Sequence, residues 1–379
     1  MELSELRKEI DRIDDALLAA FLERMQLSRE VAEYKSLNAL PVLNKERERQ
    51  ILAKVTEASG ALAPYAHRLY TTILELSRSY QESLSLSPTR VKEQIKASLA
   101  SPDELFPLSG TVAVQGVEGA YSQMAADQIF PRGSLVFFKT FEAVFDAVES
   151  GLCSYGVLPI ENSSNGSVRA VYDLIRRKNV SIVRSKRLCI RHTLLAKPGT
   201  KLPEIREIHS HEQAIGQCSR FLKSLGDKVK IIHDENTAMA SAFVAASGRS
   251  DVAAISSSEC AKLYGLEAIP AEIQNSDNNY TRFIVISREP KVYPGANRIS
   301  VILALDHRPG ALYEVLSKLA ALELNLLKLE SCPIVGHDFE FLFFLEIEGS
   351  VRDSKVANML SELERSSQQF SYLGNYQES

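Results

Sequence analysis

Apolar positions in the first fifty residues recur every three or four residues, which predicts one long amphipathic helix. Arg24 interrupts this apolar stripe, and its guanidinium stays charged at any working pH and is costly to bury without an anion. Lys35 lies eleven residues further on, so it returns to within about twenty degrees of Arg24 around the helix, about 16 Å along the axis. The pattern predicts two long cations facing one small gap. The apolar stripe consists of Leu3, Leu6, Ile10, Ile13, Leu17, Ala20, Leu27, Val31 and Tyr34.

Two shorter helical segments follow the first helix. The run KERERQILAKV predicts the second, and Pro64 predicts the start of the third. The third segment places Ser77 and Gln81 one turn apart within an apolar stripe. Residues 85–109 hold serines and prolines with weak periodicity, which indicates a linker with one loose helical turn.

From Thr111 onward, short β-rich runs alternate with amphipathic helical segments, which is typical of α/β layered domains. Two such sets occur in succession, so we expect two α/β lobes with a ligand-binding cleft between them, as in periplasmic binding proteins. The last part of the chain, from RISVILALD onward, has the order β-α-β-β-α-β of a ferredoxin-like module. The pattern therefore predicts a multidomain protein with all-α, α/β and α+β parts.

Composition narrows the classes of partner. With 379 residues, 45% hydrophobic and 24% charged, the chain is long enough for two or three domains, and its formal net charge of -4 predicts neither nucleic acid nor membrane as a partner. Five scattered cysteines without a C-x-x-C pair indicate free thiols in a reducing, cytoplasmic compartment. The charged N-terminal helix and the lack of a long apolar run indicate neither a secretory signal nor a membrane span. The histidines show no zinc spacing, so no metal ion is predicted.

The cations at Arg24 and Lys35 have two interpretations. If they bind an anion, polar residues of the second and third helices can close the gap between the helices. Arg7 lies seventeen residues before Arg24, about 25 Å along a straight helix, so only a partner subunit can bring it to the same small ligand. The alternative is purely structural, with the arginine reaching solvent or pairing with Glu23 or Glu48. Geometry alone slightly favours this alternative.

The stretch from Leu6 to Gln81 resembles the all-helical chorismate mutase family, in which two three-helix chains form a dimer. The resemblance implies that chorismate is rearranged to prephenate by positioning and electrostatics without proton transfer, with Lys35 and Gln81 facing the ether oxygen. One departure is Asn44, where the family usually has aspartate. The positions implied to bind substrate are Arg7, Arg24, Lys35, Asn44, Arg47, Glu48, Ser77 and Gln81.

Polar residues gather at element ends in the α/β region. GVEGAYSQ (116–123) follows a strand and opens a helix, where backbone N–H groups and Ser122 can hold an anion, although this signal alone is weak. PIENSSNG (159–166) ends an apolar strand and reads equally well as a plain turn, and an ordinary strand start explains Thr281-Arg282-Phe283.

Together these motifs resemble the prephenate dehydratase family, from about Thr111 to Glu289. HSHEQAIGQC (209–218) also resembles a family motif, although Glu212 stands where proline is usual. The resemblance implies Thr281 as the proton donor to the leaving hydroxyl; Glu161 is the other candidate, and needs burial to raise its pKa. The implied substrate-binding residues are Ser122, Glu161, Asn162, Ser163, Ser210, Gln217, Thr281, Arg282 and Phe283.

RPGAL (308–312) and LESCPI (329–334) read structurally as a turn and a strand end. They also resemble the ACT regulatory domain of dehydratases, which binds phenylalanine across a dimer interface. Cys332 replaces the usual arginine, which leaves the strength of feedback inhibition open. The implied effector-binding residues are Gly310, Ala311, Leu312, Glu330 and Ser331.

The sequence thus predicts a cytoplasmic enzyme of phenylalanine biosynthesis that resembles the bifunctional chorismate mutase/prephenate dehydratases. It is expected to form a homodimer or higher homo-oligomer and to need no cofactor. Two alternatives stay open: helices that serve only as a dimerisation scaffold, and a non-catalytic sensor, because fold does not fix function. The predicted domains are mutase 1–90, linker 91–109, dehydratase 110–290 and ACT domain 298–375.

Overall fold

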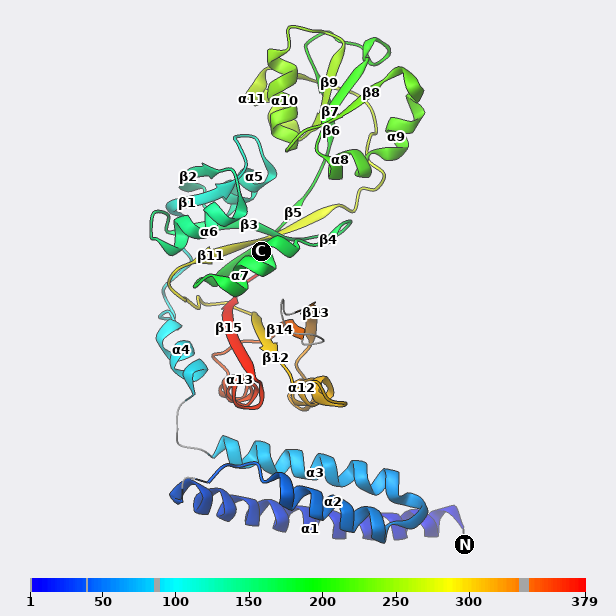
Figure 1. Cartoon of the computed structure of the whole chain (residues 1–379), viewed down its shortest axis with the longest axis vertical. Helices are drawn as coiled ribbons and strands as arrows, with labels where there is room; N and C mark the ends of the chain where they lie inside the picture. Colours follow the sequence, from blue (N-terminus) through cyan, green and yellow to red (C-terminus); the bar gives the residue numbers. More distant parts are fainter. Residues whose placement is uncertain (1, 39, 85–88, 334–340) are drawn as a thin grey trace. The chain divides into compact units, whose positions relative to one another are not determined.

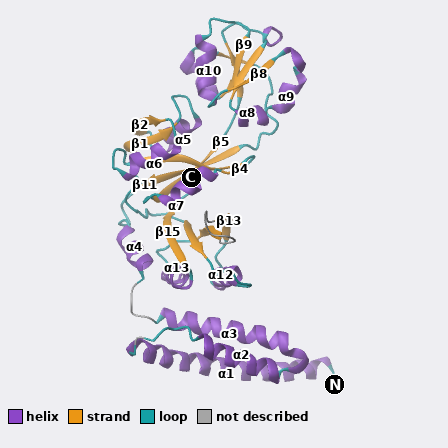
Figure 2. Ribbon diagram, in the orientation of Figure 1, coloured by secondary structure: helices purple, strands orange, loops and turns teal. Residues whose placement is uncertain are grey.

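The structure, a computed structural model, describes residues 2–38, 40–84, 89–333 and 341–379 (Figure 1). The chain divides into two compact units, Met1–Glu93 with Ala357–Ser366 and Gln94–Val356 with Ser367–Ser379. The described part of the first unit is helical, whereas the strands belong to the second unit (Figure 2). No helix within the described ranges is long and apolar enough to cross a membrane.

Three helices follow the predicted pattern in the first unit: α1 (Leu3–Leu37), α2 (Lys45–Ala58) and α3 (Ala63–Ser83). α3 packs against both α1 and α2. Much of the apolar stripe of α1 nevertheless stays exposed in a single chain, including Ile10 and Leu17 at 56% each. A face this apolar on a helix needs a covering surface to be stable in water.

The structure corrects the prediction that residues 85–109 form a linker with one loose helical turn. Residues Arg90–Ser98 form a helix, α4, in which Val91 and Ile95 are buried. Leu99 then forms a β-bridge with Val292. Nine helical residues next to a serine- and proline-containing stretch are too few to give a clear period, which explains why the pattern did not reveal the helix.

The first lobe of the second unit has a six-stranded sheet in the order β2-β1-β3-β11-β5, with β4 paired to β3. Its two faces are buried, by α6 and α7 on one side and by α5 on the other. Burial on both faces accounts for the nearly continuous apolar runs in its central strands. The elements are β1 (Ser109–Gln115), α5 (Tyr121–Ile129), β2 (Arg132–Phe138), α6 (Phe141–Glu149), β3 (Tyr155–Asn162), β4 (Gly166–Ser167), α7 (Arg169–Arg177), β5 (Ser181–Cys189) and β11 (Tyr280–Ser287).

The second lobe is inserted between β5 and β11 and has the five-stranded sheet β10-β6-β9-β7-β8. The helix predicted to run through Cys218 is broken there into α8 and α9. The predicted two-lobed α/β arrangement is therefore present. Its elements are β6 (Thr193–Ala196), β7 (Glu207–Ser210), α8 (Glu212–Gln217), α9 (Ser219–Ser224), β8 (Lys230–His233), α10 (Thr237–Ala246), β9 (Val252–Ser256), α11 (Ser258–Tyr264) and β10 (Glu267–Ile269).

The C-terminal elements have the predicted order and include an antiparallel sheet, β13-β14-β12-β15. Residues of this sheet, among them Ile302 and Phe344, share a core with Ile284 and Ile286 of the first lobe. Gly374 permits this close packing, because a Cβ atom there would overlap the Ile182 carbonyl oxygen. The elements are β12 (Arg298–Ala304), α12 (Ala311–Ala321), β13 (Leu326–Pro333), β14 (Phe341–Glu348), α13 (Ser354–Ser366) and β15 (Gln369–Tyr376).

Candidate active sites

The helical unit turns Arg24 and Lys35 inward toward α3. Arg24 Nη1 donates to the Ser77 hydroxyl, and Lys35 Nζ donates to Gln81 Oε1 at 3.3 Å. Burial lowers the pKa of Lys35, and the negative charge of Glu48 opposes this effect only in part. Both cations thus meet neutral oxygens on α3, an arrangement that can accept an anionic ligand without breaking an ion pair.

The other residues predicted to line this gap do not contact Arg24 or Lys35 among the described hydrogen bonds and ion pairs. Glu48 forms a 2.5 Å ion pair with Arg78, a residue that the sequence analysis missed although it follows Ser77 directly. Asn44 caps α2 by accepting from the Arg47 N–H at 3.0 Å, while the Arg47 guanidinium reaches Gln50. Arg7 is exposed near the start of α1, and its contribution by a second copy stays a prediction.

In the second unit, Thr281 and Asn162 face each other where β11 and β3 pair. Asn162 Nδ2 donates to Thr281 Oγ1 at 2.9 Å, and Asn162 Oδ1 accepts from the backbone N–H groups of Ser164 and Asn165, both at 3.0 Å. These two backbone donors fix the orientation of the Asn162 amide. Since Thr281 Oγ1 is an acceptor here and none of the described hydrogen bonds uses its hydrogen, the hydroxyl can donate to a substrate.

The polar contacts continue from Asn162 into the second lobe. Asn162 Nδ2 also donates to Asn279 Oδ1 at 3.0 Å, and Asn279 Nδ2 donates to Gln217 Oε1 at 2.8 Å. The structure therefore brings together Asn162, Gln217 and Thr281, which lie far apart in the sequence. Asn279 is buried and was missed, although its place two residues before Thr281 in a polar stretch was a usable signal.

Three predicted residues have structural surroundings instead. The buried Ser210 donates its hydroxyl to the Ile255 carbonyl at 2.7 Å, and Phe283 belongs to the core of the first lobe. The Ser163 hydroxyl accepts from the Tyr280 N–H at 2.9 Å and donates to the Asn278 carbonyl at 3.2 Å, so it holds the loop. The hydroxyls of Ser210 and Ser163 thus already form hydrogen bonds within the protein, and the ring of Phe283 is packed in its core.

Ser122 lies buried in the first turn of α5, after a loop that is tied to the second lobe. In this loop the Gly119 carbonyl accepts from the thiol of Cys260 at 3.3 Å. Gly119 has a φ of +89°, and a Cβ atom there would lie 2.8 Å from Cys260 Sγ. The glycine thus allows the loop to approach α11 closely.

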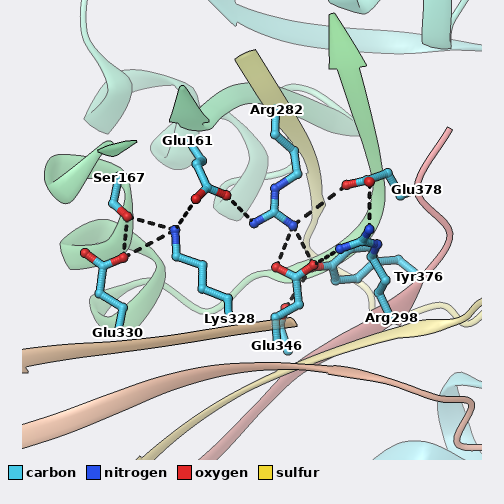
Figure 3. Close-up of polar contacts among 10 residues, drawn as sticks. Glu161, Ser167, Arg282, Arg298, Lys328, Glu330, Glu346, Tyr376 and Glu378 are labelled. Carbon is cyan, nitrogen blue, oxygen red and sulfur yellow. Dashed lines mark hydrogen bonds and ion pairs between the residues drawn. The ribbon is translucent and has the colours of Figure 1, made fainter. Parts of the chain in front are cut away.

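Arg282 requires a correction, because its guanidinium points into an ion cluster on the other face of β11 (Figure 3). Its Nη1 contacts Glu346 at 2.5 Å, and its Nη2 contacts Glu161 at 2.9 Å. Burial acts to lower the pKa of Arg282, but Glu346, together with Tyr376 and Glu161, outweighs burial and raises that pKa. Since carboxylates of the protein already occupy this guanidinium, it is not placed to hold a substrate carboxylate beside Thr281.

Glu161 belongs to the same cluster, which disfavours its protonation. Burial acts to raise its pKa, but Lys328 at 3.0 Å and Arg282 outweigh burial and lower it. The cluster continues through Arg298, which contacts Glu346 at 2.6 Å and Glu378 at 2.7 Å, and it lines a cavity of about 290 Å³. Of the two candidates for the proton donor, only Thr281 keeps a hydrogen to give.

The comparisons with known proteins decide the family. Chorismate mutase type II matches residues 6–82, and prephenate dehydratase matches residues 112–291. The bifunctional chorismate mutase/prephenate dehydratase of Escherichia coli (strain K12) is 33% identical over 99% of this chain and 96% of that protein. The chain belongs to the bifunctional chorismate mutase/prephenate dehydratase family. It is an enzyme with both activities, as the motifs predicted.

Two further relatives bear on the dehydratase of this bifunctional enzyme. The arogenate dehydratase/prephenate dehydratase 2 of Arabidopsis thaliana is 35% identical over 80% of this chain and 81% of that protein. The crystal structure of prephenate dehydratase in complex with L-Phe from Arthrobacter aurescens is 28% identical, with a TM-score of 0.64, and covers 70% of this chain and 89% of that one.

The predicted effector residues of the bifunctional enzyme fall in two places. Ala311 and Leu312 line a cavity of about 360 Å³ beside β12 and β14. Gly310, with a φ of +87°, is the N-cap of α12 and directly precedes Ala311. Glu330 lies elsewhere on β13, where it contacts Lys328 at 3.3 Å, and Ser331 follows it in the strand. Within one chain, therefore, the two motifs do not form a single site.

Proposed function

We propose that this enzyme rearranges chorismate to prephenate in its helical unit and converts prephenate to phenylpyruvate beside Thr281, under feedback inhibition by L-phenylalanine. We assign residues 1–90 to the mutase, 91–109 to a connecting segment, 110–290 to the dehydratase and 298–375 to an ACT regulatory domain. The observation that carries the dehydratase assignment is the Asn162–Thr281 hydrogen bond of 2.9 Å, which leaves the threonine hydrogen available.

In the mutase, Arg24 and Lys35 hold the substrate carboxylates and ether oxygen in a compact, reactive conformer. Negative charge grows on the ether oxygen as its bond to carbon breaks, and Lys35 and Gln81 stabilise it there. The contacts of Lys35 with Gln81 and of Arg24 with Ser77 support this role, because both cations are already oriented before substrate binds.

The mutase is completed by a second copy of the chain. The uncovered apolar stripe of α1 supports a homodimer, since leaving so much apolar helix surface in water is unfavourable. Arg7 of one copy then reaches the gap of the other. Asn44, which caps α2, contributes to this gap by fixing the start of that helix.

In the dehydratase, the ring carboxylate of prephenate leaves as carbon dioxide and its bonding electrons enter the ring. The ring hydroxyl departs as water after taking the proton that Thr281 delivers in concert, and aromatisation drives the reaction. Threonine is regenerated by a proton from solvent. Gln217 holds the substrate, and Asn162, whose amide is taken up by Thr281, Asn279 and two backbone N–H groups, positions Thr281 beside it; the chain of contacts through Asn279 supports this.

Regulation acts through the C-terminal sheet. The cavity beside Ala311 and Leu312 is of a size for an amino acid side chain, and the Arthrobacter aurescens relative was solved with L-Phe bound. A ligand shifts an equilibrium only by its differential affinity for two states, so phenylalanine must bind the less active arrangement more tightly.

Coupled turnover of the full chain tests the whole proposal. Chorismate loss and phenylpyruvate formation, the latter by its absorbance in alkali, are followed with and without phenylalanine. We expect both to occur and phenylalanine to slow phenylpyruvate formation. Unconsumed chorismate contradicts the mutase assignment and leaves the helices as a dimerisation scaffold, whereas prephenate that yields no phenylpyruvate contradicts the dehydratase assignment.

Arogenate is a second candidate substrate, because the Arabidopsis thaliana relative is named for both substrates. Arogenate carries an amino group where prephenate carries the keto group. Comparing kcat/KM for the two compounds in one assay decides between them, and we expect prephenate to be preferred because the chain also carries the mutase that makes it.

A further inference from the structure

His192 connects the two lobes of the dehydratase through side chains that the preceding assignments leave unexplained. It is 8% exposed and lies between β5 and β6, where the chain passes into the second lobe. Its Nε2 lies 2.8 Å from Gln217 Oε1, and its Nδ1 lies 3.2 Å from the Tyr121 hydroxyl. Its backbone N–H donates to Gln274 Oε1 at 3.1 Å, so both the backbone and the side chain of His192 are held in place.

The direction of each hydrogen bond in this chain follows from two backbone donors. The N–H groups of Ser164 and Asn165 point at Asn162 Oδ1, so Asn162 presents its Nδ2 to Asn279. Asn279 therefore presents Oδ1 to Asn162 and Nδ2 to Gln217, which in turn presents Oε1. An oxygen that accepts from Asn279 can accept from the imidazole as well but can give it no hydrogen.

It follows that the hydrogen of the His192 ring lies on Nε2. Burial lowers the pKa of His192, although its hydrogen bond with Gln217 opposes this, so the imidazole is neutral at physiological pH and its Nδ1 is an acceptor. The Tyr121 hydroxyl lies 3.2 Å from that nitrogen and 2.8 Å from the Arg191 carbonyl oxygen, and its single hydrogen can point to either acceptor. The imidazole ring of His192 and the carboxamide of Gln217 are thus held in one relative orientation.

We propose that His192 is a positioning residue of the dehydratase, which together with Asn279 holds the Gln217 carboxamide oxygen so that its NH2 group faces the substrate cleft. No hydrogen bond within the described ranges involves Gln217 Nε2, so both of its hydrogens are available to an acceptor such as a carboxylate or keto oxygen of prephenate. Without the imidazole donor, the amide can turn its oxygen toward an anionic substrate, which repels it. This inference rests on the proposed dehydratase site beside Thr281.

The test compares His192→Phe with His192→Gln in the full chain. Phenylalanine removes the donor, whereas the Gln amide Nε2 replaces the imidazole Nε2–H. We expect His192→Phe to raise the KM for prephenate about tenfold with a smaller change in kcat, the loss of roughly one binding hydrogen bond, and His192→Gln to restore KM to within about twofold. The matched control is His209→Gln, at a buried histidine that contacts Glu207 and Asp234 instead, and it should leave KM unchanged.

A wild-type KM in a folded His192→Phe enzyme overturns the proposal, as does a His192→Gln enzyme that is as impaired as His192→Phe. If His192→Phe does not fold, the ring tautomer decides: ¹⁵N chemical shifts of the wild-type imidazole should show the neutral Nε2–H form, and an Nδ1–H form overturns the proposal. This measurement needs no turnover, so it is independent of the proposed reaction. If Thr281→Ala keeps full dehydratase activity, the proposed function fails while the tautomer result stands.

Discussion

Thr281 and Arg282 are neighbours on β11, yet their side chains take part in different networks on opposite faces of the strand. Thr281 accepts a hydrogen bond from Asn162 at 2.9 Å, whereas Arg282 contacts Glu346 at 2.5 Å. Arg282 shares its face with Ile284, whose core extends to the C-terminal sheet. One short segment therefore carries a candidate catalytic group on one face and an attachment to the C-terminal sheet on the other.

Thr281→Ala removes the hydroxyl that we assign to proton delivery. We expect the dehydratase kcat to fall about 10²- to 10⁴-fold, the usual contribution of a general acid, while the mutase rate stays unchanged. Thr281→Ser keeps the hydroxyl and should retain much of the activity. Phenylpyruvate absorbance in alkali and chorismate loss measure the two reactions, and an alanine variant with most of its dehydratase activity would refute the assignment.

Long stretches of regular hydrophobic periodicity predicted the helices and strands best. The stripe of α1 extends over 35 residues, and the alternation of strands and helices placed the lobes correctly. The nine-residue α4 escaped detection, since so short a segment shows barely two turns of any period.

The site was predicted less completely than the fold. Motifs pointed to Asn162, Gln217 and Thr281, which do come together, but a motif does not show which face of a strand a residue occupies or what it meets there. Glu346, the partner of Arg282, lies 64 residues away along the chain, and His192 meets Gln217 across a separation of 25 residues. Such contacts follow from tertiary packing, which local pattern does not encode.

Arg282→Met breaks the buried ion cluster and leaves the carboxylate of Glu346, which is 1% exposed, without one of its partners. Removing one member of a buried ion pair is costly, so we expect the free energy of unfolding to fall by about 3 kcal/mol. The control is Arg249→Met, at an exposed pair with Asp251, where a much smaller loss is expected because solvent screens the two charges. Denaturant unfolding measures both, and equal losses in the two variants would contradict the buried role.

We expect Lys35 to set the alkaline limit of the mutase. Burial lowers its pKa from the usual 10.5, and the ammonium must be charged to act, so activity should decline as pH rises through this lowered pKa. Gln81 needs no proton, and the rate should therefore stay flat between about pH 5 and 8. In Lys35→Arg, which stays charged, any remaining activity should persist to higher pH. A mutase rate that collapses between pH 5 and 8 would contradict this assignment.

Ala311→Phe fills part of the cavity of about 360 Å³ that we assign to phenylalanine. Because the new ring occupies the space that the effector's side chain needs, we expect the phenylalanine concentration for half-maximal inhibition to rise about tenfold or more, equivalent to at least about 1.4 kcal/mol of binding. The measurement is the ratio of dehydratase rates with and without phenylalanine, together with direct binding by calorimetry. Ala321→Phe is the matched control, since Ala321 is exposed at the end of α12 and does not line the cavity. Undiminished binding to Ala311→Phe would place the effector site elsewhere on the enzyme.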